Sequence, residues 1–161
     1  MFGGFKVFRL IILLGIGLFF FLFSTLATWY EGAEIVDRPT EWKYSTPFSG
    51  SVLNASDISR LDYFVYAVKY KPTFPIVMAL SSIFLIITVG YYIFKSKLNV
   101  FAIFLSFIAL VLLVLGLQLV SSVTEGAQII SYVLLSCSAL CVIAALFQYV
   151  RPKANFLQKI E

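Results

Sequence analysis

Four long apolar segments constrain this chain more than any other feature of its sequence. They cover residues 7–30, 74–94, 98–120 and 127–150. At a rise of ~1.5 Å per residue, each can cross the ~30 Å hydrocarbon core of a bilayer, where backbone groups must pair within their own helix. The sequence therefore predicts an all-α membrane protein, a four-transmembrane-helix bundle in which residues 1–161 form a single domain.

The composition agrees with lipid as the solvent for much of the chain. Apolar residues make up 61% of the sequence and charged residues 12%, about half of the ~25% that is usual in soluble domains. Histidine is absent, which removes the commonest metal ligand and the commonest general acid/base near neutral pH. We therefore expect no cofactor, no metal site and no enzymatic activity.

The first apolar segment could be a signal peptide or a retained transmembrane helix. Lys6 and Arg9 form a basic region before its charge-free core at 10–23, and residues 25–27 would pass as a signal-peptide cleavage site. The apolar stretch, however, continues to Trp29 and Tyr30, beyond the ~7–15 residues of a typical signal-peptide core. This length favours a retained transmembrane helix.

The distribution of basic residues predicts the orientation. Short links at 95–97 and 121–126 make the later helices antiparallel neighbours, whereas a long loop at 31–72 joins the first two. One end of the predicted bundle carries the residues Lys6, Arg9, Lys95, Lys97, Arg151, Lys153 and Lys159. Lys and Arg in short loops mark the cytoplasmic side, so we expect cytoplasmic termini, a cytoplasmic tail at 151–161 and an extracytoplasmic long loop. The net charge of +4 is then explained by the Lys and Arg residues at the ends of the membrane helices. We therefore expect the lipid bilayer as a partner and no nucleic acid.

The long loop contains six of the eight acidic residues and a predicted amphipathic helix at 57–70. Ser56 or Asp57 can cap this helix. Its apolar face is predicted from side chains spaced by three and four residues, which are Ile58, Leu61, Val65 and Val68. Such a helix usually lies at the membrane interface or on neighbouring helices.

The same loop supplies the candidate partner-binding residues. Trp42 and Tyr44 are large aromatics outside the bilayer, of the kind that anchor protein interfaces. Glu31, Glu34 and Glu41 lie near them in the sequence and would favour a cationic partner. The alternative is that these aromatics only fold the loop onto the helix ends.

Small residues predict close packing between the third and fourth segments. They recur at spacings of three, four and seven and comprise Ala102, Ser106, Ala109 and Gly116, then Ser131, Ser138, Cys141 and Ala145. Stripes of small side chains let membrane helices approach closely. Both cysteines, Cys137 and Cys141, lie in the fourth segment, so no structural disulfide is expected.

Two stretches in the first half of the chain resemble a known family. Residues 28–34 read TWYEGAE and residues 41–49 read EWKYSTPFS. They resemble the paired motifs of the YjdJ-like small membrane proteins of spore-forming Gram-positive bacteria. The resemblance covers the first helix and the long loop, and it implies a bacterial plasma membrane. It implies no activity, because that family has no known function.

These observations favour a non-enzymatic accessory or interaction protein that uses its extracytoplasmic loop, with another envelope protein or a second copy of itself as partner. An oligomeric small-molecule transporter or channel is the alternative. The central parts of the four apolar segments contain no Asp, Glu, Lys or Arg, although transport usually requires an ionisable group there. A thiol–quinone oxidoreductase is a more distant alternative, because the cysteines form C-x-x-x-C in mid-segment and no loop cysteine accompanies them.

Overall fold

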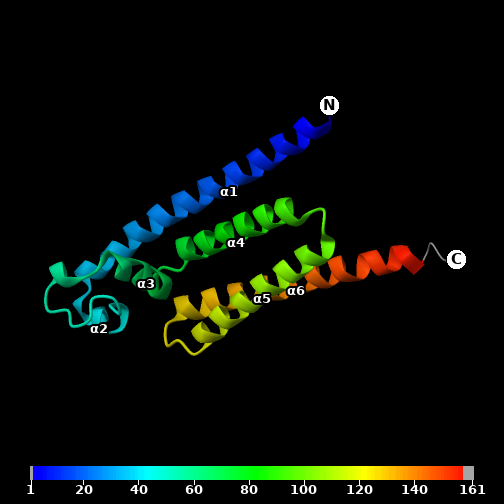
Figure 1. Cartoon of the computed structure of the whole chain (residues 1–161). Helices are drawn as coiled ribbons and strands as arrows, with labels where there is room; N and C mark the ends of the chain where they lie inside the picture. The colour runs from blue at the N-terminus through cyan, green and yellow to red at the C-terminus, as the bar shows by residue number, and fades with distance from the viewer. Residues whose placement is uncertain (1, 158–161) are drawn as a thin grey trace.

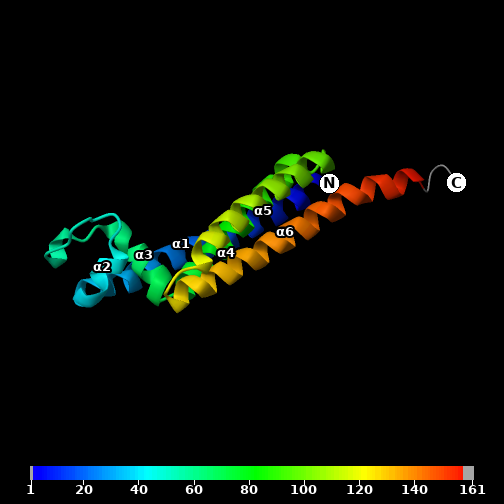
Figure 2. The ribbon, with the colours of Figure 1, turned by 90° about the horizontal axis from the view of Figure 1, so that it is seen from below.

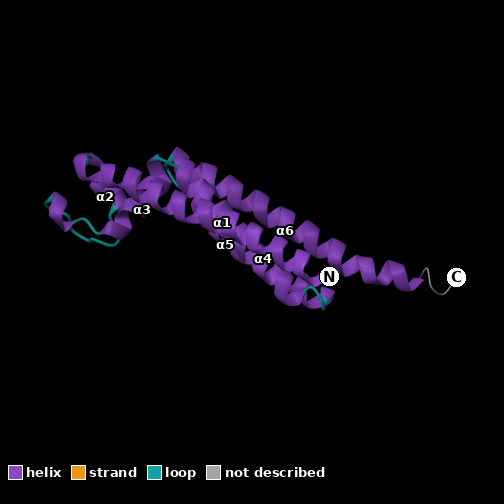
Figure 3. Cartoon of the chain, turned by 90° about the horizontal axis from the view of Figure 1, so that it is seen from above, coloured by secondary structure: helices purple, strands orange, loops and turns teal. Residues whose placement is uncertain are grey.

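The structure, a computed structural model, describes residues 2–157 and the side chains of residues 7–150. No strand occurs in the described part of the chain (Figure 3). The long helices are α1 (Phe2–Gly32), α3 (Arg60–Tyr70), α4 (Thr73–Phe94), α5 (Leu98–Val120) and α6 (Glu125–Leu157). The short ones are η1 (Ala33–Asp37), η2 (Pro39–Glu41), α2 (Trp42–Ser45) and η3 (Ala55–Asp57).

Four of these helices, α1, α4, α5 and α6, are long and apolar enough to cross a membrane. The all-α class and the four apolar helices predicted from the sequence are therefore confirmed. The bounds differ mainly at α1 and α6, which continue beyond residues 30 and 150. With 31 residues, α1 is about 46 Å long, so it exceeds the ~30 Å hydrocarbon core and can extend past it.

The four apolar helices pack as two pairs. Helix α5 packs most extensively against α6, and α1 packs against α4. Helix α4 lies between α1 and the α5–α6 pair, and α1 has no extensive contact with α5 or α6 in the described chain (Figures 1 and 2). Large apolar side chains on the outer side of α1 are consequently exposed, such as Ile11 at 61% and Phe19 at 64%.

Two serine hydroxyls join α5 to α6. Ser131 Oγ donates to Gly116 O and Ser138 Oγ donates to Ala109 O, both at 2.8 Å. A Cβ at Gly116 would stand 2.9 Å from Leu135 Cδ2, so a side chain at this position would require Leu135 to shift. Close approach and interhelical hydrogen bonds replace the hydrophobic driving force that lipid does not provide.

The small residues of the two stripes divide by burial. Those that are buried are Ala102, Ala109, Gly116, Ser131, Ser138, Cys141 and Ala145. Ser106 is exposed, and its hydroxyl donates to Ala102 O of its own helix. Both cysteines are free thiols, and Cys141 packs with Leu112 and Leu134 in the apolar core.

At one end of the molecule the chain between α1 and α4 folds over the helix ends (Figure 1). Helix α3 contacts both α1 and α6 and therefore joins the two pairs. A Cβ at Gly126, at the start of α6, would collide with the Lys69 carbonyl of α3. The start of α1 and the α4–α5 turn lie at the opposite end (Figure 1).

The serine bonds generate a prediction about the α5–α6 pair. Ser131→Ala and Ser138→Ala should each lower the free energy of unfolding by roughly 0.6–1.7 kcal/mol, because each removes one hydrogen bond between helices. Ser136→Ala is the matched control, since this exposed serine donates only to Tyr132 O of its own helix. Thermal unfolding in detergent measures all three, and equal effects from the control and the test variants would contradict the prediction.

Candidate functional site

The segment from Ala33 to Tyr70 forms a folded unit, here called the cap. Helix α1 leads into η1 at Gly32, where its backbone lies against the backbone of α3. A Cβ at Gly32 would collide with the Tyr63 carbonyl, so only glycine allows this approach. The cap is thereby attached to the end of α1.

A small apolar core holds the cap together. Ile35, Ile58 and Tyr66 are buried in it, with exposed fractions of 0%, 8% and 2%, and Trp42 packs against them. The Trp42 indole Nε1 donates to Ile35 O at 2.7 Å. Trp42 therefore packs within the cap, and its one polar atom has a hydrogen-bond partner.

A fully buried carboxylate connects the two halves of the cap. Asp62 Oδ1 accepts from the backbone N of Phe48 at 3.0 Å, and Asp62 Oδ2 accepts from the Ser49 hydroxyl. The Ser49 hydroxyl in turn accepts from Ser59 N at 2.6 Å. A buried carboxylate is tolerated when donors surround it, so these bonds fix residues 48–49 against α3.

The buried face of α3 matches the predicted apolar face only in part, because Ile58 is buried and Val68 packs against the core, but Leu61 does not. Asp62, Tyr66 and Ala67 are buried, whereas Leu61 of the predicted apolar face is 57% exposed. The reason is that Asp62 and Tyr66 find polar partners inside the cap. A prediction that uses only the spacing of apolar residues places Asp and Tyr on the solvent-exposed face of a helix.

The predicted start of this helix was also wrong. Helix α3 begins at Arg60, and Ser59 is its cap, accepting from Leu61 N at 3.3 Å. Asp57 instead accepts from Asn54 N at 3.0 Å and closes the capping box of η3. The boundary is displaced because η3, a separate turn of three residues, ends at Asp57 before α3 begins.

The acidic residues expected to attract a cation lie partly within the fold. Glu34 pairs with Arg38 at 3.0 Å and with Lys71 at 3.1 Å, and hydrogen bonds from Lys71 and then Arg38 lower the pKa of this carboxyl. Glu41 lies beside Tyr66, and burial first, then the hydrogen bond with Glu41, raises the pKa of Tyr66 to about 12. Glu31 is half-buried.

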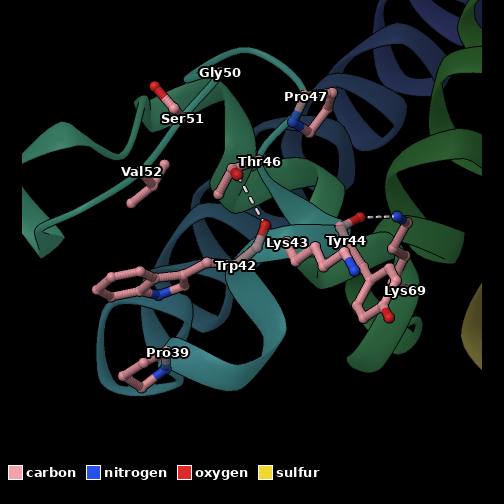
Figure 4. Close-up of a pocket in the computed structure, with 10 residues that line it drawn as sticks. All are labelled: Pro39, Trp42, Lys43, Tyr44, Thr46, Pro47, Gly50, Ser51, Val52 and Lys69. Carbon is pink, nitrogen blue, oxygen red and sulfur yellow. Dashed lines mark hydrogen bonds between the residues drawn. The ribbon is translucent and has the colours of Figure 1, made fainter.

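A pocket of about 500 Å³ opens on the cap surface (Figure 4). Its lining residues include Trp42, Lys43, Tyr44, Gly50 and Lys69. Lys69 Nζ donates to the Tyr44 carbonyl, and Lys43 Nζ lies 5.6 Å from the centre of the Tyr44 ring. No carboxylate lines this pocket, so the two lysines give it a positive charge.

Tyr44 and Gly50 shape this pocket. The Tyr44 side chain is 62% exposed, in contrast to Trp42, which packs in the cap core. Gly50 has a φ of 71°, in the left-handed region that favours glycine, and it turns the chain at the pocket wall. The arrangement presents one rigid aromatic anchor and one accessible aromatic ring beside two cations.

Similarity to known proteins identifies the family of this chain. Residues 11–94 match a family described as a domain of unknown function (DUF4306). The chain belongs to this family. It is also 31% identical over 97 residues to Uncharacterized protein YjdJ of Bacillus subtilis (strain 168), covering 56% of this chain and 88% of the relative. No solved structure matches the chain significantly.

The family assignment predicted from the sequence is thus confirmed, and its extent coincides with a structural unit. Residues 11–94 run from α1 through the cap to the end of α4. The α5–α6 pair lies outside the match. The family unit is therefore the α1–α4 pair together with its cap.

Sequence reasoning missed three residues that the structure brings to the site. Gly32 and Asp62 build the cap, and Lys69 lines the pocket. Gly32 could have been noticed, because a glycine between a long helix and a polar loop often marks a close approach. Nothing local to Asp62 or Lys69 indicated a partner that lies 13 or 25 positions away.

The ion pairs of Glu34 generate a prediction about pH. Because its pKa is lowered in the folded protein, Glu34 stabilises the fold above its ordinary pKa of about 4.3, and this contribution is lost as pH falls through the folded pKa. The difference in melting temperature between wild type and Glu34→Gln should be constant from pH 6 to 8, begin to shrink as pH approaches the ordinary pKa, and be lost as pH falls through the lowered folded pKa. Added salt should reduce it at pH 7. A difference that persists in full at low pH would contradict this role.

Proposed function

We propose that this chain is a non-enzymatic accessory protein of the bacterial plasma membrane that binds another envelope protein through its cap. In this proposal α1, α4, α5 and α6 cross the membrane, both termini are cytoplasmic and the cap lies outside. The observation that carries the proposal is the pocket on the cap, with Tyr44 exposed beside Lys43 and Lys69.

The charge of the pocket determines the kind of partner. Lys43 and Lys69 line it, while the carboxylate of Glu34 is neutralised by Arg38 and Lys71. An acidic segment with an apolar or aromatic side chain would complement this surface. The pocket therefore supports an anionic partner segment, instead of the cationic partner that the acidic loop sequence favours.

The cap is organised before any partner binds. Trp42 is fixed by its bond to Ile35 O, and residues 48–49 are fixed by Asp62. A surface that is already ordered loses little conformational entropy on binding, so affinity does not depend on folding of the loop. Recognition by a rigid aromatic surface is a known property of interface hot spots.

The sequence and the helix arrangement support the proposed topology. The start of α1, which contains Arg9, and the α4–α5 turn, which contains Lys95 and Lys97, belong to the end of the molecule away from the cap. Figure 1 shows these two elements at that end. Basic residues in short connections are retained in the cytoplasm. The non-enzymatic part of the proposal rests on the lack of histidine and on the placement of both cysteines within α6.

The cap pocket generates a binding prediction. A photoreactive amino acid at Tyr44 should cross-link a discrete partner in intact cells, whereas one at Phe48 should not. The two side chains are equally exposed, at 62%, but Phe48 does not line the pocket. Lys43→Glu should abolish the Tyr44 cross-link, because it reverses one of the two pocket charges.

The same experiment includes a stability control. The melting temperatures of the Tyr44 and Lys43 variants should stay close to that of wild type, since both side chains are exposed. Equal capture at Phe48 and Tyr44, or a loss of capture that follows a loss of stability, would remove the proposed binding site.

The topology is tested by labelling in intact cells. In a background with both cysteines replaced by alanine, cysteines at Ser51 and Ser121 should react with a membrane-impermeant thiol reagent. A cysteine at Ser96 should react only after lysis. All three serines are exposed and lie in loops or turns. Labelling of Ser96 alone in intact cells would invert the proposed orientation.

A further inference from the structure

A second cavity, here called the groove, lies between α1 and α4. Its lining residues come from the start of α1 and the end of α4, which lie at the end of the molecule opposite to the cap (Figure 1). Its volume is about 530 Å³, within the ~300–1,000 Å³ range of small-molecule sites. Its walls include Arg9, Leu10 and Leu13 of α1, together with Thr88 and Tyr92 of α4 and Lys95 just after it.

The groove is polar at its mouth and apolar inside. Arg9 and Lys95 lie nearest the helix ends, and Leu13 lies one helical turn further along α1. One more turn along, the two helices meet, because a Cβ at Gly17 would stand 2.8 Å from Leu85 Cδ2. The close approach at Gly17 thus closes the groove toward the middle of the bilayer.

The two cations at the mouth have no carboxylate partner among the described residues. Every described Asp and Glu lies in or beside the cap or at Glu125, at the other end of the molecule. Both Arg9 and Lys95 are exposed, and Lys95 Nζ lies 3.8 Å from the centre of the Tyr92 ring. The aromatic ring holds the ammonium group beside the groove.

We propose that this groove binds an anionic phospholipid of the surrounding bilayer. Arg9 and Lys95 hold the headgroup phosphate, and an acyl chain runs along Leu10 and Leu13. Charge complementarity carries the assignment, because paired cations at an interface without a carboxylate match a phosphate group. A phospholipid also matches the groove in direction, since its charged head lies at the helix ends and its chains lie toward the bilayer centre.

The same residues select an anionic over a zwitterionic lipid. A zwitterionic headgroup would bring an ammonium group to a mouth that already has two positive charges. None of the residues lining the groove is a carboxylate that could pair with it. The site is separate from the pocket on the cap, so it does not depend on the proposed partner binding.

Native mass spectrometry of the purified full chain tests the proposal. The protein is titrated with phosphatidylglycerol and, in parallel, with phosphatidylcholine that has the same acyl chains. Phosphatidylglycerol should bind more tightly. Arg9→Gln and Lys95→Gln should each weaken its binding by about fivefold, as expected for one basic residue at a lipid surface.

Two further variants make the result specific to this groove. Lys97→Gln removes a charge at the same end of the molecule, from a residue outside the groove, and should change the affinity less than about twofold. Leu13→Trp fills the groove without changing any charge and should also weaken binding. Melting temperatures report whether each variant is folded.

Three outcomes would overturn the proposal. Equal losses from Lys97→Gln and Lys95→Gln would show that only the general positive charge of this end attracts lipid. Equal affinity for the two lipids would contradict the selection of an anionic over a zwitterionic headgroup. Unchanged phosphatidylglycerol binding by a folded Leu13→Trp variant would show that no acyl chain enters the groove.

Discussion

The close approach of Gly32 on α1 to the Tyr63 carbonyl on α3 is the contact on which the cap depends. Because the two backbones meet without a side chain between them, α3 is held against the end of α1. In that position Asp62 can accept hydrogen bonds from Phe48 and Ser49, and Tyr66 can join Ile35 in the small core. The pocket on the cap surface is a consequence of this arrangement.

The molecule combines a family unit with a separate helical pair. The family match covers α1, the cap and α4, and the α5–α6 pair lies beyond it. That pair is held together by its own hydrogen bonds, which Ser131 and Ser138 donate to carbonyls of α5. It is joined to the family unit through α4 and through α3, whose Lys69 carbonyl lies against Gly126.

The sequence predicted the long apolar helices, because their length alone indicates them. It did not predict the contacts between polar residues that lie far apart in the sequence. The helix at 98–120 was predicted with its observed bounds, because a hydrocarbon core requires one continuous apolar helix. The burial of Asp62 on α3 was not predicted, since it depends on donors 13 and 14 residues away. Glu34 looked like a ligand for a cation in the sequence, but Arg38 and Lys71 already pair with it. The two lysines of the pocket come together only when α3 folds beside α2.

The role of the Gly32 contact is tested most directly by hydrogen exchange of the full chain in lipid, which compares two glycine substitutions in α1. Gly32→Ala places a Cβ against the Tyr63 carbonyl, whereas Gly15→Ala meets open space, with nothing within 4 Å. If the Gly32 contact holds the cap, the Phe48 amide and other cap amides should exchange fast in Gly32→Ala while the α5–α6 amides stay protected. Gly15→Ala should keep wild-type protection. Full protection of the cap in Gly32→Ala would contradict the claim that this contact holds the cap in place.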